Sequence, residues 1–166
     1  MPYAVPMPYR PFETQNCSIA GALAVVGERW TLLVMREVLL GSRRFAEIRR
    51  NTGVAPNILS DRLNTLVEQG LLRRRLYSEH PESYEYHPTA KGADLHPVLI
   101  ALLAWGDKYT AGPAGPPRVI VHAACHHDAD PRLHCSHCGE PLRTGEIEVR
   151  KGPGAKPETE ALAQSA

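Results

Sequence analysis

The chain has 166 residues, 43% of them hydrophobic, and a formal net charge of +1 at pH 7, which fits one compact domain with a small appendage. No stretch approaches the roughly 20 apolar residues of a membrane span, and the N-terminus lacks the pattern of a secretion signal. Cys17 is isolated, whereas Cys125, Cys135 and Cys138 are clustered, so the cysteines do not form a secreted disulfide framework. We therefore expect a cytoplasmic protein with no membrane partner.

Composition divides the chain into five parts. Residues 1–16 are rich in proline and predict a flexible arm. The run of alanine, glycine and proline at 111–117 cannot continue a helix and predicts a linker. Residues 17–110 before this linker predict the main domain, and residues 118–150 after it form a short segment with histidine and cysteine. Residues 151–166 predict a disordered tail.

Within the main domain, the periodicity of apolar residues changes along the chain. Helical spacing recurs four times, at Ile19–Val26, Trp30–Leu40, Phe45–Asn51 and Pro56–Gln69. Alternating patterns then predict two strands, Leu71–Leu76 and Tyr84–His87, joined by a loop at 77–83. Ser18 is placed to cap the first helix, and Thr89 is placed to cap a final long helix that runs past Trp105.

The third helix, a turn at Thr52–Val54 and the fourth helix predict a helix-turn-helix. A hairpin directly after it predicts the winged form. The expected fold class of the main domain is therefore mainly α with a small β-hairpin wing, and the fourth helix is the expected recognition helix.

Positive charge is concentrated in this region. From Arg36 to Arg75 there are nine arginines and only four acidic residues, although the whole chain is nearly neutral. Arginine forks suit phosphate groups and base edges, so the pattern predicts contact with double-stranded DNA. The positioning cations are expected around the third helix and on the first wing strand, at Arg43, Arg44, Arg49, Arg50, Arg73, Arg74 and Arg75. Because strand side chains alternate, either Arg73 and Arg75 or Arg74 alone can face DNA.

The expected recognition helix has two different faces. Leu59, Leu63, Leu66 and Val67 form one apolar stripe, while polar residues occupy the other side. Asparagine and serine can read base edges, and arginine can read guanine or bind phosphate. The residues predicted to contact the major groove are Asn57, Ser60, Arg62 and Asn64.

Two short-spaced pairs stand out after the linker. His122 and Cys125 are separated by two residues, and so are Cys135 and Cys138. Such pairs can each occupy two corners of a tetrahedral zinc site, and four protein ligands make a closed, structural site. With strands expected at 118–121 and 145–150, the segment predicts a small zinc-ribbon-like β unit. Four further histidines could replace the first ligand, namely His126, His127, His134 and His137.

An ordered set of segments resembles the HxlR-type winged helix-turn-helix regulators, a group related to MarR. The matching segments are Cys17–Ile19, Val26–Leu33, Gly41–Ile48, Leu59–Leu63, Gly70–Arg74, Tyr84–Thr89 and Trp105–Gly106. The resemblance covers roughly residues 17–109. It implies a sequence-specific transcription factor that acts as a homodimer through its first and last helices. It also implies that a cysteine near the N-terminus, here Cys17, senses oxidants or electrophiles in some members.

Several alternatives stay open at this point. A winged helix can bind protein instead of DNA, so the second hypothesis is a protein-interaction module with a structural zinc site. An enzyme is not expected, since the sequence shows no nucleophile motif, phosphate loop or paired carboxylates. Cys17 precedes a helix whose dipole favours a thiolate, but an inert, partly buried thiol is the simpler interpretation. A small-molecule effector is not identified by these patterns.

Overall fold

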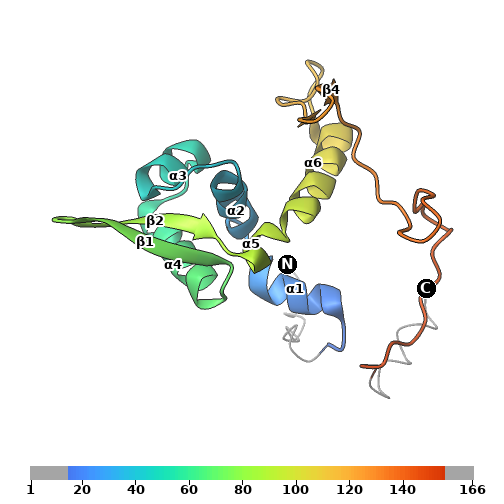
Figure 1. The fold of residues 1–166 in the computed structure, drawn as a ribbon, viewed down its shortest axis with the longest axis horizontal. Helices are drawn as coiled ribbons and strands as arrows, with labels where there is room; N and C mark the ends of the chain where they lie inside the picture. The colour runs from blue at the N-terminus through green and yellow to red at the C-terminus, as the bar shows by residue number, and fades with distance from the viewer. Residues whose placement is uncertain (1–14, 156–166) are drawn as a thin grey trace, which may run out of the picture.

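The computed structural model describes residues 15–155, and its elements follow the predicted order (Figure 1). The helices are α1 (Ser18–Val26), α2 (Thr31–Leu39), α3 (Phe45–Thr52), α4 (Pro56–Glu68), α5 (Ala90–Ala93) and α6 (His96–Thr110). The strands are β1 (Leu72–Glu79), β2 (Glu82–Pro88), β3 (Val121–His122) and β4 (His127–Asp128). Residues 1–14 of the predicted arm and 156–166 of the predicted tail lie outside the described residues.

The hydrophobic core lies between α2, α3, α4 and the base of the hairpin. Leu59, Leu63 and Leu66 place one face of α4 in this core, and Val67 packs partly against it. Burying each leucine stabilises the fold by roughly 1.5–3 kcal/mol. The core partners from the other elements are Val34, Met35, Val38, Ile48, Leu71 and Leu72. The apolar stripe predicted for the fourth helix is thus confirmed.

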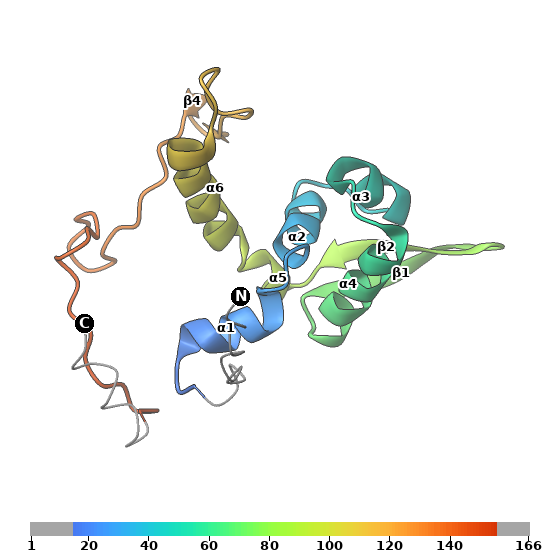
Figure 2. The same ribbon diagram turned by 180° about the vertical axis from the view of Figure 1, so that it is seen from behind.

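The hairpin is longer than the sequence indicates. β1 and β2 pair antiparallel as far as Glu79 and Glu82, with an irregularity between Leu76 and Ser78. The predicted loop at 77–83 is therefore reduced to His80 and Pro81 between the strands. Proline cannot donate a ladder hydrogen bond, but at the end of a hairpin no such bond is required. Figure 2 shows the hairpin projecting well beyond the helices.

The predicted final helix is interrupted. Thr89 caps α5 as expected, since its hydroxyl accepts a hydrogen bond from the Gly92 N–H at 3.1 Å. A new helix, α6, then begins at His96 and carries Pro97 in its first turn. Proline has no N–H for the carbonyl of Ala93, and its ring collides with that carbonyl in a continuous helix. The chain therefore breaks at Asp94–Leu95.

Two predicted details at the ends of the chain differ from the structure. Ser18 is the first residue of α1 and not its cap, because Cys17 occupies the extended N-cap position. In the C-terminal segment the described strands are β3 and β4, which pair with each other, so of the strand predicted at 118–121 only Val121 is extended and paired. The strand predicted at 145–150 is wrong. No described strand pairs with it, and Ile147 and Val149 are exposed.

Across residues 15–155, no single helix is long and apolar enough to cross a membrane. Only α1 and α2 taken together, with a bend of 79° between them, reach that length and composition.

Gly92 offers a test of how α5 is joined to the hairpin. A Cβ atom at this position would lie 2.1 Å from the carbonyl oxygen of Leu71 and 3.3 Å from the Cε of Met35. We expect Gly92→Ala to lower the free energy of unfolding by about 1–3 kcal/mol through overpacking. Gly21 in α1 is the control, since a Cβ there meets nothing within 4 Å.

The Gly21→Ala variant is expected to gain up to about 1 kcal/mol, because glycine is unfavourable within a helix. Urea unfolding of both variants at one protein concentration makes the comparison. Equal stability of the two variants would contradict a close α5–hairpin contact.

Candidate nucleic-acid interface

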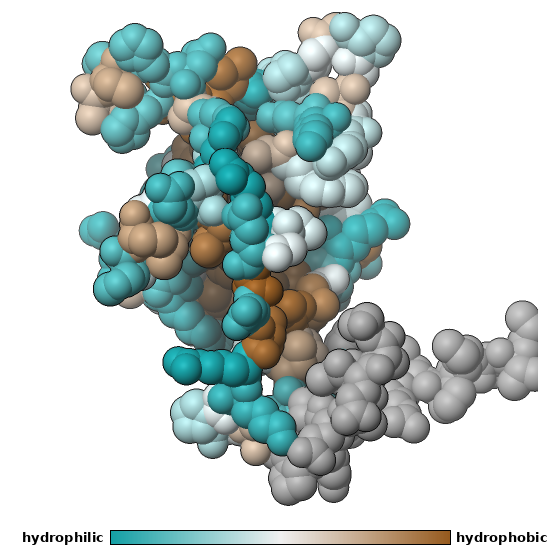
Figure 3. All heavy atoms as spheres, turned by 90° about the vertical axis from the view of Figure 1, so that its right-hand side faces the viewer, coloured by the Kyte–Doolittle hydropathy of each residue, from teal (hydrophilic) through white to brown (hydrophobic). Residues whose placement is uncertain are grey.

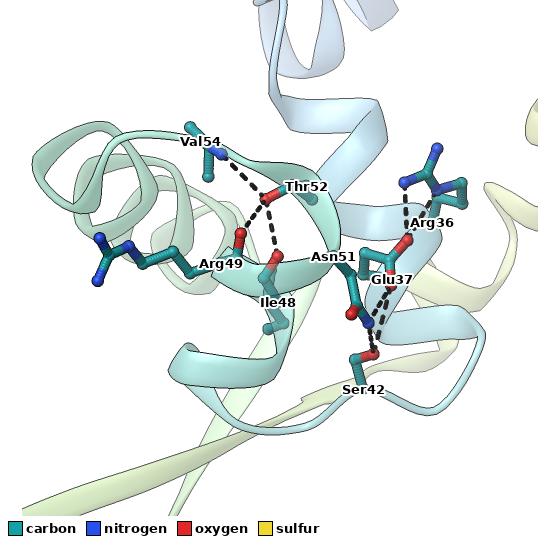
Figure 4. A network of polar contacts seen from close by, with 8 residues as sticks. All are labelled: Arg36, Glu37, Ser42, Ile48, Arg49, Asn51, Thr52 and Val54. Atoms are coloured by element: carbon teal, nitrogen blue, oxygen red, sulfur yellow. Dashed lines mark hydrogen bonds and ion pairs between the residues drawn. The ribbon is translucent and has the colours of Figure 1, made fainter.

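The turn between α3 and α4 is closed by local backbone geometry. Gly53 ends α3 in the left-handed region, with φ of 71°, where glycine carries no steric penalty. The hydroxyl of Thr52 donates to the carbonyl oxygen of Ile48 at 2.7 Å and accepts from the N–H of Val54 at 3.4 Å (Figure 4). Pro56 then begins α4 at a position that suits proline. The predicted helix-turn-helix is thus formed.

A buried carboxylate joins α2 to α3, the first helix of the helix-turn-helix. Glu37 of α2 is 5% exposed. It accepts hydrogen bonds from Arg36 at 2.7 Å and from the Asn51 amide of α3 at 2.9 Å, and a longer one from Ser42 at 3.4 Å (Figure 4). Glu37 therefore sets the position of α3 relative to α2. The sequence offered no signal for it beyond a charge in an apolar helix face.

Burial and hydrogen bonding have opposite effects on the pKa of Glu37. Burial raises the pKa, but the hydrogen bonds from Asn51 and Arg36 and the charge of Arg36 together outweigh burial. The net result is a pKa below the ordinary value of 4.5. Glu37 is therefore held as a carboxylate between α2 and α3.

The outer face of α4 is polar and open to solvent. Asn57, Ser60 and Asn64 are all exposed, as the helical spacing predicted. Arg62 lies differently, because it is only partly exposed and its Nε is 3.7 Å from Glu28 Oε2. Glu28 also accepts the Trp30 N–H at 2.9 Å, so it links the turn before α2 to α4. The structure thus separates Arg62 from the three exposed polar residues.

The arginines around α3 fall into two groups. The guanidinium of Arg43 donates to the carbonyl oxygen of Val38 at the end of α2. Arg44 is exposed and pairs with Glu85 at 3.3 Å, and its guanidinium lies 4.5 Å from the centre of the Tyr77 ring. Arg49 and Arg50 are exposed in the last turn of α3. Arg43 and Arg44 thus both have partners within the fold, but Arg43 is only partly exposed, whereas Arg44, Arg49 and Arg50 are exposed at the surface.

The start of α3 is attached directly to the wing. The Tyr86 N–H donates to the carbonyl oxygen of Arg43 at 2.8 Å, and Arg44 forms an isolated antiparallel bridge with Glu85. Glu47 accepts the N–H groups of Arg43 and Arg44 at 3.0 and 3.1 Å. These backbone hydrogen bonds hold the pKa of Glu47 below its ordinary value, and the bond from Arg44 has the larger effect.

The register of the wing assigns the three consecutive arginines to two faces. Arg74 is opposite Tyr86, and its guanidinium lies 4.9 Å from the centre of the Tyr84 ring. Burial raises the pKa of Tyr86, which packs against the core. Arg73 and Arg75 are opposite His87 and Glu85 on the other face of the hairpin. All three arginines are exposed.

The cysteine and histidine residues form pairs but not a cluster of four. His122 Nδ1 lies 3.3 Å from Cys125 Sγ. The sulfur of Cys135 accepts hydrogen bonds from the backbone N–H groups of Cys138 and His137, which lower its pKa. Among residues 15–155, no three histidine, cysteine or acidic side chains are close enough together to hold a metal ion. Cys17 lies far from both pairs along the chain and is exposed at the start of α1.

A helix-turn-helix followed at once by a two-stranded hairpin defines the winged helix-turn-helix class of transcriptional regulators. The chain belongs to the HxlR-like helix-turn-helix family, which matches residues 25–113. The resemblance found in the sequence is therefore confirmed, and the protein is a transcriptional regulator of the helix-turn-helix type.

Relatives extend the similarity beyond the family match. The transcriptional regulator Rv3095 of Mycobacterium tuberculosis is 47% identical over 139 residues, which are 84% of this chain and 88% of the relative. The crystal structure of PA1607, a candidate transcription factor, has a TM-score of 0.74 at 32% identity and covers 84% of this chain and 98% of its own. The redox regulator HypR in its reduced form has a TM-score of 0.52 at 27% identity, over 55% of this chain and 92% of its own. The relatives are named as regulators and not as enzymes.

Glu37 predicts a dependence of stability on pH. We expect Glu37→Gln to lower the free energy of unfolding at pH 7 by roughly 1–3 kcal/mol, because hydrogen bonds to a charged group are lost. The folded pKa is lowered, so the ionised group stabilises the fold above pH 4.5, its ordinary pKa. This stabilisation is lost as the pH falls from there through the folded pKa.

Urea unfolding at pH 7 and at several pH values below 4.5 measures the effect. The difference between wild type and Glu37→Gln should shrink as the solution becomes more acidic. The Ser42→Ala control removes the 3.4 Å hydrogen bond to Glu37 and the 3.1 Å hydrogen bond that Ser42 accepts from Asn51, but it leaves the shorter bonds to Glu37, so it should cost less than Glu37→Gln. A difference that grew toward low pH would contradict an ionised Glu37.

Proposed function

We propose that the protein is a sequence-specific regulator that binds double-stranded DNA as a homodimer, with α4 in the major groove and the wing on the phosphate backbone. The observation that carries this proposal is the two-faced α4. Its leucines are held in the core, while a continuous polar face is presented to solvent. A helix anchored in this way can enter a groove without losing its packing.

Base reading is assigned to the three exposed polar residues of α4. Asparagine can bond adenine through two hydrogen bonds, so Asn57 and Asn64 suit adenine in the major groove, and Ser60 can bond several base edges. Arg62 and Arg43 are only partly exposed and have partners within the protein, and we assign both of them to positioning the helix-turn-helix. Exposed guanidinium groups on α3 and the wing, at Arg44, Arg49, Arg50, Arg73 and Arg75, supply contacts with phosphates.

A second copy of the chain is the partner that fits α1 and α6. No residue of α6 is buried, although the helix carries Val98, Leu102 and Trp105. In α1, Ile19 is 71% exposed and Leu23 is also exposed. Figure 3 shows apolar side chains gathered in the middle of the face that looks away from the wing. Burial between two copies removes this surface from water and places two recognition helices on one palindromic site.

Cys17 is the candidate regulatory thiol. It is exposed and begins α1, one of the two helices assigned to the dimer. Reaction of this thiol would therefore alter a group beside the interface. The solved structures of HypR include both a reduced and an oxidised form, which supports a redox role within this fold. Operator binding by wild type and Cys17→Ser, before and after a mild oxidant, tests this role against an inert thiol.

The DNA contacts can be separated by their dependence on sequence and salt. Double replacement of Arg73 and Arg75 by alanine should weaken binding to every duplex alike. It should also reduce the slope of log affinity against log salt by about 2, because each phosphate contact releases counterions. Asn64→Ala should instead change the preferred sequence, at a cost of roughly 1–3 kcal/mol on the best site.

The control is Arg143→Ala, which removes an exposed cation that pairs only locally with Glu146 at 3.7 Å. Fluorescence anisotropy with selected and random duplexes at several salt concentrations measures all three variants. Wild-type affinity of the double variant near 150 mM salt would contradict the wing assignment. Absence of any duplex binding by the folded wild type would favour the protein-interaction module.

If α1 and α6 form the dimer interface, a single charge introduced there should separate the two copies. Leu102→Glu should convert the dimer to a monomer at micromolar concentration, because a carboxylate would have to be buried between two helices. Leu40→Glu is the control, as Leu40 is 60% exposed at the end of α2 and lies outside α1 and α6. Light scattering after gel filtration gives the mass of each variant. A wild-type monomer, or an unchanged mass for Leu102→Glu, would contradict this interface.

A further inference from the structure

The first of two half-sites lies on a small hairpin at the end of α6. His122 ends β3, and its ring nitrogen Nδ1 is 3.3 Å from the sulfur of Cys125. The carbonyl oxygen of His122 accepts the N–H groups of Cys125 and His126, at 3.2 and 2.8 Å, which closes the turn. The segment leading into this hairpin lies against α6, where Leu103 and Asp107 form a groove with Val119 and Ile120. Imidazole nitrogen and thiolate sulfur are thus paired on an anchored turn.

The second half-site is a tight turn around Cys135 and Cys138. The Gly139 N–H donates to the carbonyl oxygen of Cys135 at 2.8 Å, and Gly139 has φ of 77°, a conformation that favours glycine. The backbone N–H groups of His137 and Cys138 point at the sulfur of Cys135, which also contacts the Cys138 thiol. Such donors stabilise the negative charge that a metal-bound thiolate carries. The turn therefore presents two sulfurs side by side.

We propose that one zinc ion per chain is bound by His122, Cys125, Cys135 and Cys138, and that it draws the second half-site onto the first. Each half-site supplies two ligands, and zinc takes four nitrogen and sulfur ligands in a tetrahedral arrangement. The two half-sites lie apart along the chain after α6, joined by residues 129–134 (Figure 1). The Ala129 N–H donates to the carbonyl oxygen of Ile120 and the Leu142 N–H donates to that of Leu133, each at 2.8 Å. The bend that brings the half-sites together therefore falls between these two bonds, at residues 130–132, which form no helix or strand.

The choice of His122 among the histidines follows from their contacts. His127 Nδ1 lies 2.7 Å from the carbonyl oxygen of Cys125, and His134 Nδ1 lies 2.9 Å from that of Gly139. Within the described part of the chain, His122 is the histidine whose ring contacts a cysteine sulfur. Four protein ligands leave no position for a substrate, so the ion has a structural role.

The segment needs such an ion because it has no core of its own. Its apolar side chains stay exposed, among them Val121, Leu133 and Ile147. A unit this small cannot bury enough apolar surface to hold one arrangement, and metal binding then supplies the free energy of folding. The zinc ion would fasten residues 132–142 to the end of α6.

Zinc content and proteolysis test the proposal on the full-length protein, purified without a histidine tag or chelator. Elemental analysis should give about one zinc per chain for wild type and for Cys17→Ser, the control for a cysteine outside the site. Cys135→Ser and His122→Ala should each lose most of the ion, with circular dichroism confirming that the helices remain. Trypsin cleavage after Arg132, in the connector, should be slow with zinc and fast after a chelator or in Cys135→Ser.

Each contrary result would overturn one part of the zinc proposal. Less than about 0.2 zinc per chain in wild type removes the site, since a closed zinc site binds tightly. Zinc retained by His122→Ala removes His122 from the ligand set. Cleavage after Arg132 that does not respond to zinc shows that the ion does not join the half-sites. Cobalt replacement gives a second readout, because visible absorption typical of tetrahedral thiolate ligation should appear in wild type and vanish in Cys135→Ser.

Discussion

The packing of one leucine face of α4 against α2 and α3 determines the geometry of the whole DNA-binding body. Leu59, Leu63 and Leu66 fix the rotation of α4 about its own axis, and that rotation decides which residues face solvent. Glu37 adds a polar link that fixes α3 relative to α2, and the bridge between Arg44 and Glu85 fixes the wing relative to α3. The surface presented by α3, α4 and the wing is therefore a consequence of three internal constraints.

The helix-turn-helix could be predicted because its signals are local. The leucine spacing of α4, the proline at its start and Gly53 in the turn each act within a few residues of the chain. The break in the final helix could not be predicted from periodicity alone, because the apolar spacing continues through the break. Pro97 was the available signal, since its ring and missing N–H act on the preceding turn.

The arginines show which features of the candidate site could not be predicted from the sequence. Nine arginines in one region predict a cationic surface, but they do not reveal which of them are committed within the fold. Arg43 bonds Val38 at the end of α2, whereas Arg62 faces Glu28, which lies in a distant turn of the chain. The alternation of Arg73, Arg74 and Arg75 was likewise predictable, whereas their assignment to faces required the pairing with Tyr86 and Glu85. Site membership depends on tertiary partners that composition does not encode.

The break between α5 and α6 has a consequence for the spacing of an operator. α5 belongs to the DNA-binding body, because Gly92 lies directly against Leu71. α6 has no buried residue and belongs to the surface that we propose for the dimer. In a two-fold dimer built on α6, the bend at Asp94–Leu95 is therefore the joint that sets how far apart the two α4 helices lie. Half-sites one helical turn apart require about 34–36 Å between recognition helices. In the proposed dimer, the angle of this short connection would select which palindromes can be spanned.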